Sequence, residues 1–150
     1  MALEDDIRIL AAVSLFHGFS EEQLRLLAFG AETIRLTAGR ELFREGATAD
    51  CAFVVVRGSV SLYRERGGVR QIIATAKPPD LLGEYALITD VKRMTGARIE
   101  VDSEVMRLSR KLFRRILEEY PEAAVTLHDR IAHDLTEMLG RIGQLAPRFQ

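Results

Sequence analysis

The chain has 150 residues, of which 47% are hydrophobic and 29% are charged, a balance typical of a soluble globular protein with one sizeable core. The formal net charge of −1 excludes a general electrostatic attraction to DNA or to a membrane surface. A single cysteine, Cys51, excludes an intramolecular disulfide. With an acidic N-terminus that lacks the features of a signal peptide, these observations predict a cytoplasmic protein.

The first part of the chain predicts short helices over about residues 5–30. Apolar residues recur at helical spacing from Asp5 to Val13, and again after Ser20. Ser20 and Gln23 have the spacing of a capping box, in which each side chain accepts a hydrogen bond from the other residue's backbone. Gly30 stands where such a helix is expected to end.

Between about residues 32 and 108 the pattern changes to short segments rich in β-branched and aromatic residues. Turn signals such as Gly67-Gly68 and Pro78-Pro79 separate them. The predicted strands cover residues 33–36, 41–43, 52–57, 60–64, 69–74 and 99–109. Many short strands with such turns predict a mainly β fold, an antiparallel β jelly roll (double-stranded β-helix) with N-terminal helices and two C-terminal helices.

Helical periodicity returns over about residues 110–145. Ser109 is a predicted N-cap, and Pro121 ends one helix and suits the first turn of the next. Apolar residues then recur at spacings of four and three, and Ala124 and His128 extend the stripe backward; its members are Ile131, Leu135, Met138, Ile142 and Leu145. The stripe either folds back on the roll or pairs with a second copy, and we favour a homodimer.

The stretch from Leu82 to Arg98 carries the residues of a candidate binding site. Gly83 frees the backbone beside the carboxylate of Glu84, and Arg93 follows nine residues later. Exposed backbone N–H groups can hold a phosphate, and a guanidinium can bind it through two parallel hydrogen bonds. A carboxylate can accept a hydrogen bond from a sugar hydroxyl. These residues predict a site for a small anion that carries hydroxyl groups.

With these motifs in place, residues 15–145 resemble a cyclic nucleotide-binding domain of the type in catabolite activator proteins, cyclic-nucleotide-dependent kinases and gated channels. The resemblance rests on the turn at 41–46, the strand and turn at 53–60, Asp80, and the phosphate-binding cassette at 82–98. It implies one domain over residues 1–150, without enzymatic activity. Regulation would come through movement of the C-terminal helices.

The resemblance also implies roles for individual residues. Glu84 would bind the ribose 2′-hydroxyl and Arg93 the cyclic phosphate, with backbone N–H groups around Ala86 and Met94 completing the phosphate site. The residues expected to contact the ligand are Gly83, Glu84, Tyr85, Ala86, Arg93, Met94 and Thr95 in the cassette, Leu62, Ile73 and Ala74 on the roll, and Met138 over the purine.

Several positions depart from the family pattern. Lys92 replaces the usual proline, and Met94 lacks the hydroxyl that often accompanies cyclic GMP, which favours cyclic AMP. Gly96 is expected to loosen the strand that leaves the cassette. Two alternatives stay open: a degenerate domain that serves dimerisation or protein interaction, and a cyclic dinucleotide as the ligand.

Other function classes find little support. In the basic run from Arg107 to Arg115, Arg114 and Arg115 are expected to pair with residues 118 and 119, both glutamates, on a solvated helix face. We therefore expect no direct DNA binding. No recognition helix follows Leu145, so we expect no DNA-binding domain and action through a partner or a larger protein. The three histidines all fall near helices, which disfavours a metal site. Cys51 is expected to be a small buried residue.

Overall fold

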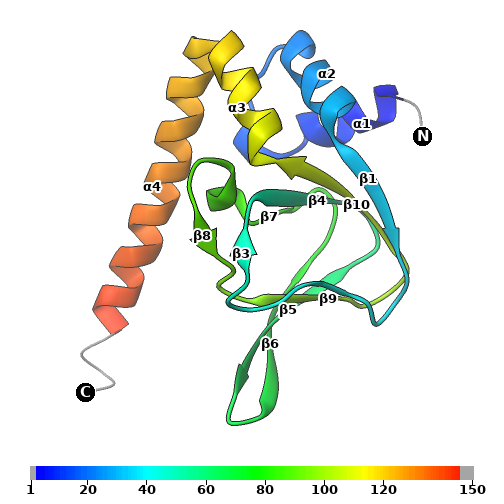
Figure 1. Ribbon diagram of the computed structural model, residues 1–150, viewed down its shortest axis with the longest axis vertical. Helices are drawn as coiled ribbons and strands as arrows, with labels where there is room; N and C mark the ends of the chain where they lie inside the picture. Colours follow the sequence, from blue (N-terminus) through cyan, green and yellow to red (C-terminus); the bar gives the residue numbers. More distant parts are fainter. Residues whose placement is uncertain (1–2, 146–150) are drawn as a thin grey trace.

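Two antiparallel sheets pack against each other and form the predicted jelly roll (Figure 1). The computed structural model describes residues 3–145, without the side chains of 138–145. One sheet has the order β1 (Glu32–Leu36), β10 (Ser103–Ser109), β4 (Cys51–Arg57), β7 (Leu81–Leu82). The other has the order β2 (Glu41–Phe43), β9 (Gly96–Ile99), β5 (Val60–Arg66), β6 (Val69–Ala76). A small ladder joins β3 (Thr48–Ala49) to β8 (Val91–Lys92).

The interior of the roll is filled from both sheets. Alternate residues of a strand point to opposite faces, so each strand supplies every second side chain to the core. Phe53 and Val55 of β4 meet Val60 of β5 and Ile99 of β9 in one buried cluster, together with Leu82. This cluster fixes the strands that surround the cassette.

The predicted strand over residues 99–109 is two strands in the structure. β9 ends at Ile99 in one sheet, and β10 begins at Ser103 in the other. The carboxylate of Asp102 accepts a hydrogen bond from the N–H of Ala38 at 2.9 Å, which holds the connecting turn. Val101, a β-branched residue that suggested an unbroken strand, is half exposed in this turn.

Helices flank the roll on both ends of the sequence. Before the roll come α1 (Leu3–Ala11), the 3₁₀ turn η1 (Ser14–Phe16) and α2 (Glu21–Gly30), and after it come α3 (Arg110–Glu119) and α4 (Pro121–Leu145). The 3₁₀ turn η2 (Glu84–Leu87) lies within the roll, between β7 and β8. The capping box of Ser20 and Gln23 is present as predicted. Ser109 accepts a hydrogen bond from the N–H of Leu112, and Pro121 begins α4. In the part described, no helix is both long and apolar enough to cross a bilayer.

The helices α1, α2 and α3 gather at one end of the roll, and α4 runs from there along its side (Figure 1). A second core holds them together, with Leu10, Phe16 and Phe113 fully or almost fully buried. Leu127 and Ile131 of α4 belong to the same core. The prediction of a dimer contact is therefore wrong at Ile131. This side chain packs inside its own domain, because α4 lies against α3 and η1.

The remainder of the stripe is less buried or not described. Leu135 is half-buried, and His128 is exposed. Met138, Ile142 and Leu145 lie on α4, but their side chains are outside the described residues. α4 contacts η2, which places the helix next to the cassette.

Candidate functional site

The cassette surrounds a cavity of about 200 Å³. The walls come from the end of β2, from β3, and from the segment that runs from β7 through η2 and β8. Seven predicted ligand residues line it: Gly83, Glu84, Tyr85, Ala86, Arg93, Met94 and Thr95. Among the described residues, five more line it: Phe43, Ala49, Leu81, Val91 and Lys92.

Arg93 is a buried cation at this cavity, with 8% of its surface exposed. Its Nη2 donates to the carbonyl oxygen of Cys51 at 2.9 Å and contacts the Cys51 sulfur at 3.4 Å. The guanidinium lies 4.4 Å from the ring centroid of Phe43. Its Nη1 is buried and has no hydrogen-bond partner among the described residues. Buried polar groups are normally paired, so this nitrogen is a donor available to an anion.

Gly83 allows the backbone to pass close to that guanidinium. Its φ is +80°, in the left-handed region that favours glycine. A Cβ at this position would collide with Nη1 of Arg93. Both the conformation and the close approach therefore require glycine here.

Glu84 begins η2 and is turned toward α4. Its carboxyl group is hydrogen-bonded to the carboxyl group of Asp134. Desolvation by burial, and then the charge of Asp134, raise the pKa of Glu84 from 4.5 to about 7. The side chain expected to accept from a ribose hydroxyl is thus already hydrogen-bonded within the protein.

The backbone of η2 is held from both sides. The N–H of Ala86 donates to the carbonyl of Gly83 at 3.1 Å, within the 3₁₀ turn. The carbonyl of Ala86 accepts from Nε of Arg110 at 2.7 Å. Arg110 also donates to the carbonyl of Ala49 at 2.7 Å and forms an ion pair with Asp90. The first residue of α3 therefore ties the cassette to β3.

The predicted contacts on the roll lie elsewhere. Leu62 packs against the roll core, and Ile73 and Ala74 are exposed on β6. None of the three is among the described residues that line the cavity. The side chain of Met138 lies outside the described residues.

Two residues that hold the guanidinium of Arg93 were not predicted from the sequence. Cys51 is buried as expected, but its carbonyl and sulfur also contact Arg93. The sequence predicted Phe43 only as a residue of a short strand. In the structure its ring stacks on the same guanidinium. An aromatic residue in a short strand carries no sign of which cation it will contact.

Gly96 does not loosen its strand, contrary to the expectation from the sequence. It is the first residue of β9 and pairs with Tyr63 on β5. A Cβ at Gly96 would collide with the Tyr63 ring. The glycine makes room for this buried aromatic side chain.

The basic residues around α3 also differ from the prediction. Arg107 pairs with Asp50 at 3.5 Å, and Arg110 pairs with Asp90. Within the described residues, no ion pair joins the arginines of α3 to Glu118 or Glu119. The acidic partners come from the roll because the N-terminus of α3 packs against it.

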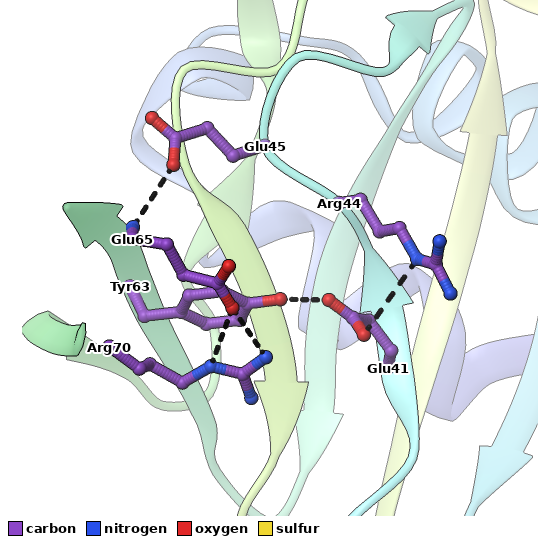
Figure 2. Close-up of a pocket in the computed structure, with 6 residues that line it drawn as sticks. All are labelled: Glu41, Arg44, Glu45, Tyr63, Glu65 and Arg70. Carbon is purple, nitrogen blue, oxygen red and sulfur yellow. Dashed lines mark hydrogen bonds and ion pairs between the residues drawn. The ribbon is translucent and has the colours of Figure 1, made fainter. Parts of the chain in front are cut away.

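A second hollow, of about 400 Å³, lies between β2 and the β5–β6 hairpin (Figure 2). The hydroxyl of Tyr63 donates to Glu41, and Arg44 lies 4.0 Å from the same carboxylate. Arg70 donates to Glu65 at 2.9 Å and lies 4.0 Å above the Tyr63 ring. These charged groups are paired with one another, so the cassette cavity is the better candidate for an anion.

Metal binding finds no support in the part of the chain with described side chains. There, no three His, Cys, Asp or Glu residues lie close enough together to hold a metal ion. The unpaired donor in the cassette cavity is a cation, which suits an anionic ligand.

Residues 33–120 match the family model of the cyclic nucleotide-binding domain. The chain belongs to this family. The match runs from β1 to the residue that follows α3, and so includes the whole cassette.

Three relatives show how much of this chain and of their own length the similarity covers. A cyclic nucleotide-binding-like protein from Brucella abortus is 56% identical, covers 76% of this chain and 98% of its own, and superposes with a TM-score of 0.71. The cyclic AMP receptor protein of Thermus thermophilus is 27% identical over 128 residues, which is 85% of this chain and 56% of that protein. Mouse patatin-like phospholipase domain-containing protein 6 is 27% identical over 84% of this chain, but the match spans only 9% of that protein.

Proposed function

We propose that this cyclic nucleotide-binding domain is a non-catalytic sensor that binds a cyclic mononucleotide in the cassette cavity. The buried guanidinium of Arg93, whose Nη1 has no partner in the part of the chain that the structure describes, carries this proposal. A phosphate at Nη1 would supply the missing acceptor and offset the positive charge. The stacked ring of Phe43 and the carbonyl of Cys51 hold the guanidinium in place for it.

Cyclic AMP is the favoured ligand. Met94 lines the cavity and offers no side-chain hydroxyl to a guanine base. The name of the Thermus relative, cyclic AMP receptor protein, supports the same choice. Glu84 is the proposed acceptor for the ribose 2′-hydroxyl, once its carboxyl group is released from Asp134.

The signal would leave the domain through its C-terminal helices. η2 contacts α4, and Arg110 at the start of α3 binds the cassette backbone. A change in the cassette would therefore move both helices relative to the roll. We also propose a cytoplasmic location and a homodimer through the part of α4 beyond Ile131.

A second candidate is a domain that no longer binds nucleotide and serves protein interaction. The hydrogen bond between Glu84 and Asp134 favours it, since it occupies the expected ribose acceptor. A cyclic dinucleotide is a further possible ligand for the same arginine. A binding measurement separates all three.

The test is isothermal titration of the purified chain with cyclic AMP, cyclic GMP and a cyclic dinucleotide. We expect saturable binding of cyclic AMP, and a loss of affinity of about 100-fold in Arg93→Ala, because a charge-assisted pair is removed. Arg98→Ala is the matched control, since Arg98 is an exposed arginine five residues further along, outside the cavity lining. Equal affinity in Arg93→Ala and wild type would contradict the proposal, and absence of binding would favour the interaction domain.

A further inference from the structure

The buried face of α4 carries a carboxylate. Leu127 and Ile131 are fully buried, and Asp134 follows three residues after Ile131. Residues three, four and seven apart lie on one face of a helix, so Asp134 continues the face that packs on the domain. Asp134 is half-buried, and the helix that carries it contacts η2.

The partner of Asp134 is the carboxyl group of Glu84. Two carboxyl groups share a hydrogen bond only when one of them keeps its proton, so one proton belongs to this pair. Burial and the negative charge of Asp134 raise the pKa of Glu84 to about 7, which keeps that proton on Glu84 near neutral pH. The pair therefore joins the cassette to α4.

Several other charged groups lie near Glu84 in the described part of the chain. Glu84 also borders another cavity, of about 320 Å³, which Asp80 lines as well. Lys92 and Arg93 line the cassette cavity with it. One turn before Asp134 on α4, Arg130 donates to the carbonyls of Leu15 and His17, at 3.0 and 2.6 Å.

Among the described charged groups near Glu84, Asp134 is therefore the one that is hydrogen-bonded to its carboxyl group. Asp80 turns its carboxylate to the N–H of Lys77, at 3.0 Å. The guanidinium of Arg93 is oriented by Cys51 and Phe43, and that of Arg130 by η1 and the residue after it. His133, beside Asp134, lies 3.3 Å from Glu137 on the exposed face of α4.

We propose that Asp134 is a positioning residue that holds Glu84 in the empty site, and that a ligand's sugar hydroxyl displaces it. The hydroxyl donates to the Glu84 carboxylate, the shared proton leaves to solvent, and the two carboxylates then repel each other. Ligand binding and the docking of α4 on η2 thus compete for one carboxyl group. This inference rests on the proposed function, because the displacing group is the hydroxyl of the bound nucleotide.

Proton release makes affinity depend on pH in a defined direction. Below pH 7 the empty site must lose a proton to bind, whereas above pH 7 Glu84 is already ionised. Linkage then predicts about tenfold tighter binding at pH 8 than at pH 6. Without Asp134, Glu84 ionises at lower pH, so the affinity at pH 6 should rise about fivefold and the pH dependence should shrink.

The experiment is calorimetric titration with cyclic AMP at pH 6, 7 and 8, in buffers of different ionisation enthalpy, so that proton release is measured directly. Asp134→Ala removes the partner, and Asp134→Asn keeps a hydrogen bond to Glu84 without the charge. Both should lose most of the pH dependence, and only Asp134→Ala, which leaves no side chain hydrogen-bonded to Glu84, should gain the full affinity at pH 6. Asp129→Ala is the matched control, since Asp129 is an exposed aspartate on the same helix.

A ligand-free measurement checks the pair itself. Carbon-13 NMR of the Glu84 carboxyl group, assigned with Glu84→Gln, should show a pKa near 7 that falls in Asp134→Ala. An unchanged Glu84 titration, or nucleotide binding with the same affinity and pH profile in Asp134→Ala as in wild type, would overturn the displacement alone. Failure of wild type to bind any cyclic nucleotide would overturn the proposed function and the displacement with it.

Discussion

Arg93 lowers the stability of the folded domain when no anion is bound. It is buried, it has no ion pair with a described carboxylate, and its Nη1 has no hydrogen-bond partner. A buried charge that lacks a counterion opposes folding, and stacking on Phe43 offsets only part of that cost. Such a local conflict is expected at a binding site, where the ligand supplies the missing partner.

Replacing this arginine by an apolar residue of similar length should therefore stabilise the ligand-free domain. We expect Arg93→Met to raise the free energy of unfolding by about 1–2 kcal/mol, measured by urea denaturation. Arg98→Met, at an exposed position on β9, should change it by less than about 0.5 kcal/mol. A less stable Arg93→Met variant would mean that the contacts with Cys51 and Phe43 outweigh the buried charge.

Single residues were predictable where one local motif carried the chemistry. Gly83, Glu84 and Arg93 stand close together in sequence, and all three line the cavity. Their neighbours Cys51 and Asp134 come from distant segments. One sequence contains no information on which remote side chain a cassette residue will meet, so these contacts required the structure.

At the scale of elements, Arg110 links α3 to the cassette. Its side chain donates to the carbonyls of Ala86 and Ala49 and pairs with Asp90. Removing it leaves two carbonyls without these donors, which should cost about 2–3 kcal/mol in unfolding free energy. We expect Arg110→Ala also to speed amide hydrogen exchange across residues 84–92.

Arg114→Ala is the control for this prediction, since Arg114 is exposed on the same helix. It should leave both the stability and the exchange rates near their wild-type values. Slow exchange across residues 84–92 in Arg110→Ala would show that the cassette is held by its strands alone.

Element boundaries were predictable where the chain carries a local signal. The capping box at Ser20, the N-cap at Ser109 and the start of α4 at Pro121 all rest on such signals. The break between β9 and β10 was missed because Val101 continues a strand-like composition through the turn. The apolar period of α4 marked a packing face, but not that Ile131 would pack on its own domain.

At the scale of the whole molecule, the alternation of short strands and turns was enough to predict the roll. That signal is repeated along about half of the chain, so an error in one strand does not change the architecture. The charge distribution is different, because its energetic effect depends on which groups become buried. Glu84 and Asp6 both have a raised pKa through burial, whereas Glu45 has a lowered pKa through its hydrogen bonds to the Glu65 N–H and to Arg66.

Glu84 makes the stability of the empty domain depend on pH in an unusual direction for a carboxylate. The folded state keeps its proton up to pH of about 7, whereas the unfolded chain releases it near 4.5. Its contribution to stability is therefore complete below pH 4.5 and is lost as pH rises through 7. Each unit of pKa shift corresponds to about 1.4 kcal/mol, and partial exposure reduces the expected change to about 1 kcal/mol between pH 5 and 7.5.

Comparison with Glu84→Gln isolates this contribution from that of every other group. The amide keeps a hydrogen bond to Asp134 but does not titrate, so the variant should gain stability relative to wild type as pH rises. The measurement is urea denaturation of both proteins from pH 5 to 7.5, with the difference in unfolding free energy plotted against pH. A flat difference would show that Glu84 ionises near its ordinary pKa in the folded domain, and that its contact with Asp134 does not hold a proton.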